Sequence, residues 1–191
     1  MPGKIKTLIL VFALLIAALA AGCDTEKPVT VTPPTSTPAT VKEQTPGNVA
    51  KEETIRLTIY FATKDAMYLV PEEHVVPKTS QPAHVAIEHL LSGPTSGELE
   101  KVMPEGVKLR GLHVKEHIAY VDFNDKLVKN NPGGSASEIL IVGAIVDTLT
   151  QFPDIQKVQI LVEGKKIDTL SGHLDLSEPL SRSEGIIKKK P

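Results

Sequence analysis

The sequence lacks tryptophan, and aromatic residues make up only 4% of its 191 residues. Proteins that stack sugars or nucleic-acid bases on aromatic side chains usually need more of these residues. The formal net charge is −2 at pH 7, which argues against a basic stripe for the phosphates of nucleic acids. We therefore expect no nucleic-acid partner.

Cysteine is almost absent, and the single copy, Cys23, is the most informative residue. It follows Lys4, Lys6, an apolar run over Leu8–Ala21 and the small residue Gly22. A basic start, a short apolar stretch and small residues before a cut site are typical of a secretory signal peptide. Cysteine directly after such residues resembles the bacterial lipobox. The resemblance implies cleavage after residue 22 and a diacylglycerol on Cys23, which leaves no cysteine for a disulfide or a thiolate site.

A long hydrophobic run is also missing. Leu8–Ala21 is 14 residues long, short of the ~20 residues of a membrane-spanning helix, so this alternative is disfavoured. Residues 23–54 carry five prolines among threonines and no apolar period, which predicts a disordered tether. We expect a domain held by lipid on the extracytoplasmic face of the cell membrane.

Residues 55–180 carry the periodic patterns of a folded domain. Alternation of apolar and polar residues predicts a strand over 55–61, with extended segments at 66–70 and 75–76. Pro71 indicates an edge or a turn. A helix starting at Pro82 and stopping before Gly93 is indicated by one apolar stripe: Ala83, Ala86, Ile87, Leu90 and Leu91.

Two more strands are predicted over 107–115, with Gly111 as a bulge, and 118–123. The connection Lys115-Glu116-His117 lacks the Asn-Gly or Asp-Gly signal of a tight hairpin, so its turn type stays open.

A second helix is predicted from Ser135 to the residue before Pro153. Ser135 and Glu138 have capping-box spacing. The β-branched residues that follow are compatible with a strand, but the length and the cap favour a helix packed on more than one side. Residues 158–162 form a core strand, and 166–170 can pair back.

This order of elements predicts an α+β fold, with a mixed β-sheet and two main α-helices packed on one face. The polar, basic tail at 181–191 is expected to fray.

A search for a metal or catalytic site finds no convincing set of residues. His84 and His89 lie about 140° apart around a helix, and His113 and His117 lie on extended chain and a turn. We expect solvated histidines, no metal and no cofactor. The serine candidates lack a nucleophile motif; they are Ser92, Ser171 and Ser135, which is explained as a helix cap. The carboxylate pairs have structural explanations: Asp122 and Asp125 lie at a strand end, and Glu72 and Glu73 lie in a solvated loop.

Two further features allow binding without requiring it. Gly133 and Gly134 precede the second helix and could cradle an anion, but Glu138 in the first turn would repel it, so a flexible connection is favoured. Lys188, Lys189 and Lys190 could contact anionic lipid, although three lysines are more often a solvated tail.

The ordered motifs of the domain resemble the GerMN family. They are Leu69-Val70-Pro71-Glu72, Leu90-Leu91-Ser92-Gly93-Pro94, Met103-Pro104-Glu105-Gly106, Ala119-Tyr120-Val121-Asp122-Phe123, Ile145-Val146-Asp147-Thr148-Leu149-Thr150, Val158-Gln159-Ile160-Leu161-Val162-Glu163-Gly164 and Gly172-His173-Leu174-Asp175 before Pro179-Leu180.

The resemblance implies a fold similar to ring-building motifs and a non-catalytic module that binds an envelope protein partner during spore formation and germination. The alternatives are an enzyme or binding protein acting on cell-wall polymer, which needs convergent acidic groups, and a soluble-ligand carrier, which needs a closed apolar pocket.

Overall fold

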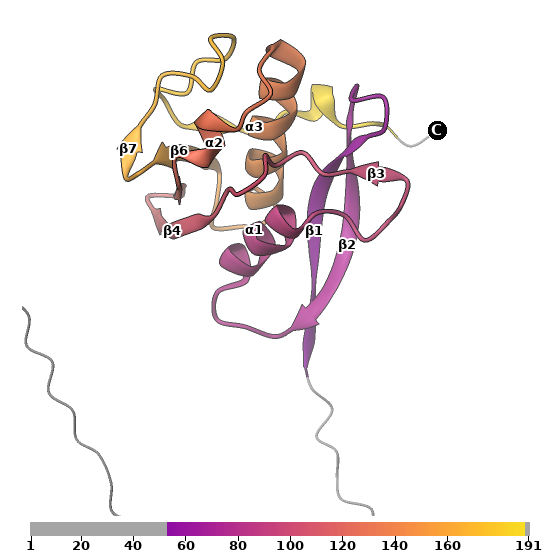
Figure 1. The fold of residues 1–191 in the computed structure, drawn as a ribbon. Helices are drawn as coiled ribbons and strands as arrows, with labels where there is room; N and C mark the ends of the chain where they lie inside the picture. The colour runs from indigo at the N-terminus through magenta and orange to yellow at the C-terminus, as the bar shows by residue number, and fades with distance from the viewer. Residues whose placement is uncertain (1–52, 190–191) are drawn as a thin grey trace, which may run out of the picture. The chain divides into compact units, whose positions relative to one another are not determined.

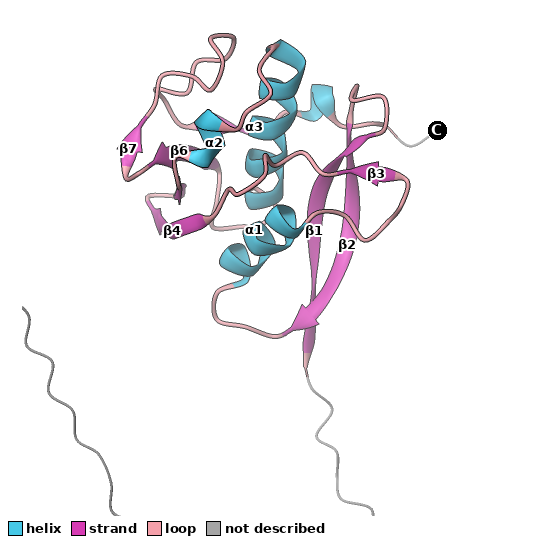
Figure 2. Cartoon of the chain, viewed as in Figure 1, coloured by secondary structure: helices cyan, strands magenta, loops and turns pink. Residues whose placement is uncertain are grey.

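The computed structural model describes residues 53–189 (Figures 1 and 2). Cys23, the predicted signal peptide and most of the predicted tether lie outside these residues. The elements are β1 (Thr54–Thr63), β2 (Leu69–Pro77), α1 (Pro82–Ser92), β3 (Leu99–Glu100), β4 (Leu109–Lys115), β5 (Ile118–Phe123), α2 (Lys126–Lys129), α3 (Ser135–Leu149), β6 (Lys157–Val162), β7 (Lys165–Lys166), β8 (Leu180–Ser181) and the 3-10 helix η1 (Glu184–Ile186).

The predicted α+β class is confirmed, with α1 and α3 as the two main helices. The strands divide between two sheets. The first is antiparallel with the order β2-β1-β3, and the second has the order β4-β5-β6-β7 with β8 also paired to β6. The second sheet is mixed, because β5 and β6 run parallel. The division was not predictable from alternation, which shows which residues face a core but not which strands pair. Within residues 53–189, no helix has the length and apolarity to cross a membrane.

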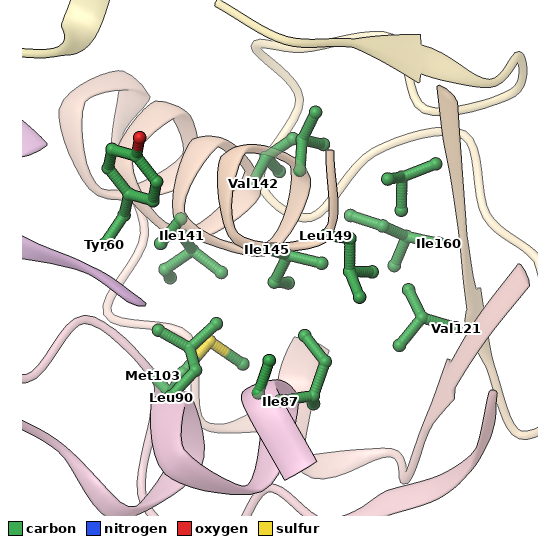
Figure 3. Packing of buried hydrophobic residues seen from close by; sticks show 14 of the residues in the cluster. Tyr60, Ile87, Leu90, Met103, Val121, Ile141, Val142, Ile145, Leu149 and Ile160 are labelled. Atoms are coloured by element: carbon green, nitrogen blue, oxygen red, sulfur yellow. The ribbon is translucent and has the colours of Figure 1, made fainter. Parts of the chain in front are cut away.

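Helix α3 lies between the two sheets (Figure 1) and contacts β1, β2, β6 and α1. Its side chains are buried from Leu140 to Leu149, which confirms packing on more than one side. Figure 3 shows Ile145 pointing toward Ile87 of α1, with Leu149 on the side of Ile160. The apolar core is therefore built around this helix.

Strand β2 is longer than predicted. It runs without interruption from Leu69 to Pro77, where two separate extended segments were expected. Pro71 opposes Tyr60 of β1, and it is tolerated because β2 is the outer strand of its sheet. The edge position indicated by Pro71 is thus confirmed, and the separate strand at 75–76 is wrong.

The hairpin between β4 and β5 is a two-residue turn made without glycine. Lys115 pairs with Ile118, and the intervening Glu116 and His117 have φ angles of 51° and 61°. Positive φ at both central residues is the geometry that Asn-Gly adopts most readily. The predicted bulge is also confirmed, because the register shifts between Leu109 and Gly111.

Replacing Glu116 by Asn and His117 by Gly together should raise the free energy of unfolding by about 1–2 kcal/mol, because left-handed backbone costs other residues about that much. Chemical denaturation of the full chain measures this change. A double alanine variant at the same positions keeps both Cβ atoms and should show no gain. Equal stability of the Asn-Gly variant and the original chain would contradict this reading of the turn.

Thr148 near the end of α3 and Gln151 just beyond it cover the part of the β1 edge opposite β2 that β3 does not pair with. Gln151 accepts from the Thr58 N–H at 2.8 Å and donates to the Thr58 carbonyl at 2.7 Å. The Tyr60 N–H donates to Thr148 Oγ1 at 3.2 Å. These side chains take the place of a neighbouring strand, so this edge is closed.

Replacing Gln151 with Leu should lower the free energy of unfolding by about 2 kcal/mol, because the N–H and the carbonyl of Thr58 both lose a partner. Urea denaturation measures the loss. Gln156→Leu, at an exposed position, is the matched control and should change stability little. A Gln151 variant as stable as this control would show that water replaces the amide without cost.

The C-terminal strap (Ser181–Lys189) packs on the domain, whereas fraying was predicted. Arg182 lies over the Tyr60 ring at 4.9 Å and donates to the Tyr60 hydroxyl and to the Asp147 carbonyl. The Ser183 N–H donates to Asp147 Oδ1 at 3.1 Å. The sequence suggested a free tail because it is mostly polar, but Arg182, backbone N–H groups and the apolar side chains of Ile186 and Ile187 hold it against the domain.

Close packing continues along the strap. A Cβ on Gly143 of α3 would overlap Ile186 Cδ1, so the absence of a side chain at Gly143 makes room for the strap. The Lys188 N–H donates to the Leu69 carbonyl at 2.8 Å, at the start of β2. The strap therefore covers one face of α3 and the first residue of the β2 edge.

Candidate functional site

The titratable side chains of residues 53–189 do not form a group of three or more His, Cys, Asp or Glu that could hold a metal ion. His84 lies 3.7 Å from Glu88 on the outer side of α1. His113 stacks on Tyr120 with ring centroids 5.0 Å apart, and His117 lies in the exposed hairpin turn. These three histidines occupy partly or fully exposed positions, as predicted.

A buried histidine was missed by the sequence analysis. His74 of β2 is only 6% exposed. Its Nδ1 lies 2.8 Å from Nδ1 of His89, and its Nε2 lies 2.7 Å from Oε1 of Glu72. The prediction that all histidines are solvated is therefore wrong for His74 and incomplete for His89, which is half-buried in the last turn of α1. Alternation along β2 could have indicated His74, since it shares a face with Val76.

Glu72 lies in β2 and holds the loop after α1 by hydrogen bonds, so the prediction that it lies in a solvated loop is wrong. Its carboxylate accepts from the Thr95 N–H at 2.8 Å, the Thr95 hydroxyl at 2.7 Å and the Ser96 N–H at 3.1 Å. Burial alone would raise the pKa of Glu72, but the hydrogen bonds from Thr95, Ser96 and His74 outweigh it and lower the pKa. Glu73, the next residue, is exposed and lies 3.7 Å from Arg56.

Glu138 does not complete a capping box. Ser135 is the first residue of α3, Gly134 is the N-cap, and no side chain caps this end. The Glu138 carboxylate is fully buried and accepts from the loop after β7. Its donors are the Thr169 hydroxyl and the N–H groups of Leu170, Ser171 and His173.

The serine and aspartate candidates have structural roles. The Ser92 hydroxyl donates to the Glu88 carbonyl at 2.8 Å, and Ser171 Oγ accepts from Asn131 at 2.8 Å. Asp122 lies in β5, near its end as predicted, and accepts from the Gly164 N–H and from Arg110, each at 2.8 Å. Asp125 instead pairs with Lys129 at 2.6 Å. The two aspartates are thus engaged separately.

A cavity of about 620 Å³ lies at the start of α3, beside Gly133 and Gly134. Lys64 and Lys101 line it. Glu138 is not among the lining residues, because its carboxylate is held by the 169–173 loop. The expected repulsion of an anion by Glu138 is therefore not supported by the structure.

The edges of the sheets define the surfaces on which another chain could add a strand. The edge of β1 opposite β2 is covered by Gln151, by Thr148 and by the paired strand β3. On β2, Pro71 and Pro77 lack N–H donors, and the strap occupies the Leu69 carbonyl. Such prolines discourage pairing. The strands β7 and β8 have two residues each.

Strand β4 is the longest remaining edge among residues 53–189, because it pairs only with β5. Val114 near its end is 44% exposed. Residues 111–114 line one side of a groove of about 700 Å³, whose other sides are formed by residues 80–84 at the start of α1 and 152–155 before β6. We name this surface the β4 groove. An unpaired edge beside an apolar groove is the arrangement used in strand addition.

Comparison with known proteins agrees with the motif order. The family described as "Germane: Sporulation and spore germination" matches residues 58–168. The spore germination protein GerM of Bacillus subtilis (strain 168) is 29% identical over 142 residues, which cover 70% of this chain and 37% of GerM.

Solved structures of GerM from Bacillus subtilis have the same fold. The tandem GerMN domains match with a TM-score of 0.59 and 26% identity, over 76% of this chain and 51% of that chain. The first GerMN domain matches with a TM-score of 0.57 and 26% identity, over 67% of this chain and 98% of that chain. The chain therefore spans about a third of the length of the curated relative and about half of its tandem-domain structure, and it belongs to the Germane (GerMN) family of sporulation and spore germination proteins.

Proposed function

We propose that this chain is a lipoprotein, anchored through Cys23 on the extracytoplasmic face of the membrane, whose GerMN domain binds an envelope protein during spore formation and germination. The observation that carries the proposal is membership of the GerMN family together with an open β4 edge beside an apolar groove. The domain acts as a scaffold and binds its partner without catalysing a reaction.

The anchor is supported by the sequence around Cys23, a cysteine placed directly after a short apolar segment and small residues. Its test is fractionation of the host cell. The full chain should be found in the membrane fraction and carry a lipid mass on its N-terminal residue, whereas Cys23→Ala should remain uncleaved or be released. Equal membrane association and an equal N-terminus in both proteins would contradict the anchor.

The partner site is supported by the β4 groove. An extended segment of an envelope protein would hydrogen-bond to the edge of β4 and place apolar side chains against Val114 and the groove wall. Its affinity would come from main-chain hydrogen bonds and its selectivity from the groove. A charge on this edge should block such pairing.

The test uses two exposed valines on different sheet edges. Val114→Glu should abolish function in the host, whereas Val75→Glu on β2, where the side chain is 64% exposed, should leave it intact. Both proteins should melt at similar temperatures because neither valine is buried. Full function of Val114→Glu, or loss of function in both variants, would contradict the assignment of the β4 groove.

A further inference from the structure

We infer that His74 and His89 form a proton-controlled latch, which holds the end of α1 against β2 while the two imidazoles carry at most one extra proton and opens when both are protonated. The latch is independent of the partner site proposed above. It rests on the geometry of three side chains from two elements and on the loop that they hold.

The tautomer of His74 follows from its neighbours. The ionised Glu72 carboxylate can only accept hydrogen bonds, so His74 Nε2, 2.7 Å away, must carry a proton. When His74 is neutral its Nδ1 therefore has a free lone pair. That lone pair lies 2.8 Å from His89 Nδ1, and the short distance requires His89 to donate a proton from its own Nδ1.

Only one proton fits between the two Nδ1 atoms. A single added proton is accommodated on His89 Nε2, which leaves the His89 Nδ1–H pointing at the His74 lone pair, or on His74 Nδ1 if His89 moves its own proton to Nε2, so the contact persists. If both rings are protonated, two N–H groups face each other across 2.8 Å and two positive charges lie in rings with centroids 4.9 Å apart. Burial, and then the charge of His74, lower the pKa of His89. This direction agrees with the repulsion expected when both rings are protonated.

The charged groups around the latch do not compensate the second proton. From β2 and the adjoining strand, Glu73 is paired with Arg56. From the outer side of α1, His84 lies beside Glu88. Beyond the end of α1, Lys101 is paired with Glu105 at 3.3 Å. Glu72 is the carboxylate in contact with the pair, and it is already held by the loop at Thr95 and Ser96.

Opening of the latch should therefore release more than the two rings. His89 lies in the last turn of α1, and the loop that follows is tied to Glu72, which is tied to His74. Separation of the rings frees the last turn of α1, and the 93–97 loop that follows it is then held by its hydrogen bonds to Glu72 without the support of His89. Acid should loosen the end of α1 and the 93–97 loop while the core around α3 stays closed.

Hydrogen exchange of the full chain tests the latch through the Thr95 and Ser96 amides. After correction for intrinsic exchange, their protection should fall about tenfold or more between pH 7 and pH 5, a change of ~1.4 kcal/mol in local opening. His89→Leu and His89→Gln, either of which removes the titrating ring, should abolish the pH step. His84→Gln, on the outer side of the same helix, should keep it.

Nitrogen-15 NMR of the histidine rings supplies the second measurement. At pH 7 the spectra should show His74 protonated on Nε2 and His89 protonated on Nδ1, and the signature of a hydrogen bond between the two Nδ1 atoms should be lost only when both rings have gained a second proton. A pH step that persists in both His89 variants, or unchanged protection of both amides down to pH 5, would overturn the latch.

Discussion

Replacing Glu138 with Gln should destabilise the protein by about 3 kcal/mol at pH 7, and Glu138→Ala should cost more. The carboxylate is fully buried and accepts four hydrogen bonds from one loop. Burial alone would raise the pKa of Glu138, but these hydrogen bonds outweigh it and lower the pKa from 4.5 to about 2. Because one pKa unit corresponds to ~1.4 kcal/mol, the ionised form contributes about 3 kcal/mol. An amide would turn an N–H toward one of these donors.

The pH dependence of this contribution has a definite sign. The pKa of Glu138 is lower in the folded state, so the stabilisation is present above pH 4.5 and is lost as the pH falls toward 2. Urea denaturation at pH 7 and pH 3 should show a smaller difference between Glu138→Gln and the original chain at the lower pH. Glu88→Gln, with a side chain 52% exposed, is the control. Similar stability of both variants at pH 7 would show that the 169–173 loop does not depend on Glu138.

Replacing Asp147 with Asn should have the opposite effect and stabilise the protein at pH 8 by up to about 3 kcal/mol. Asp147 is fully buried, and its Oδ2 lacks a hydrogen-bond partner within residues 53–189. Burial raises its pKa from 3.8 to about 6, although the Ser183 N–H and Arg182 oppose the change. Asn keeps an oxygen for the Ser183 N–H and removes a buried charge. Because one pKa unit corresponds to ~1.4 kcal/mol, the rise in the pKa of Asp147 from 3.8 to about 6 corresponds to ~3 kcal/mol.

The sign again follows from linkage. A raised pKa means that the folded state binds the proton more tightly, so the original chain loses this stabilisation as the pH rises through 6. The gain from Asp147→Asn should therefore be largest at pH 8 and close to zero at pH 4. Melting temperatures at the two pH values measure it, with the exposed Asp154→Asn as the control. A destabilised Asp147→Asn at pH 8 would show that Arg182 requires the charge.

Glu138 and Asp147 also show the limit of sequence reasoning here. The boundaries of α1 and β5 were predictable because the apolar period, Pro82 and Gly93 are local signals. Glu138 matched a capping box by spacing, yet its donors lie 31 to 35 residues further along the chain. No local pattern encodes such a contact. The partners of Asp147 are also distant, because Arg182 and Ser183 lie 35 and 36 residues further along the chain.

The candidate surfaces were even harder to predict from the sequence. The position of a free sheet edge depends on which edges are closed by Gln151, by the prolines of β2 and by the strap. The latch depends on His74, which lies on the buried face of β2, and on its register against α1. Each of these features is a long-range juxtaposition, so the family resemblance predicted the fold while the contacts required the structure.

Deletion of the gene in its own host, followed by sporulation and germination counts, tests the central claim most directly. The deletion strain is complemented with the full chain or with Cys23→Ala at equal protein levels. We expect the deletion to impair spore formation or germination, the full chain to restore it, and Cys23→Ala to fail. Normal spores from the deletion strain, or full rescue by Cys23→Ala, would contradict a membrane-anchored GerMN scaffold acting in these processes.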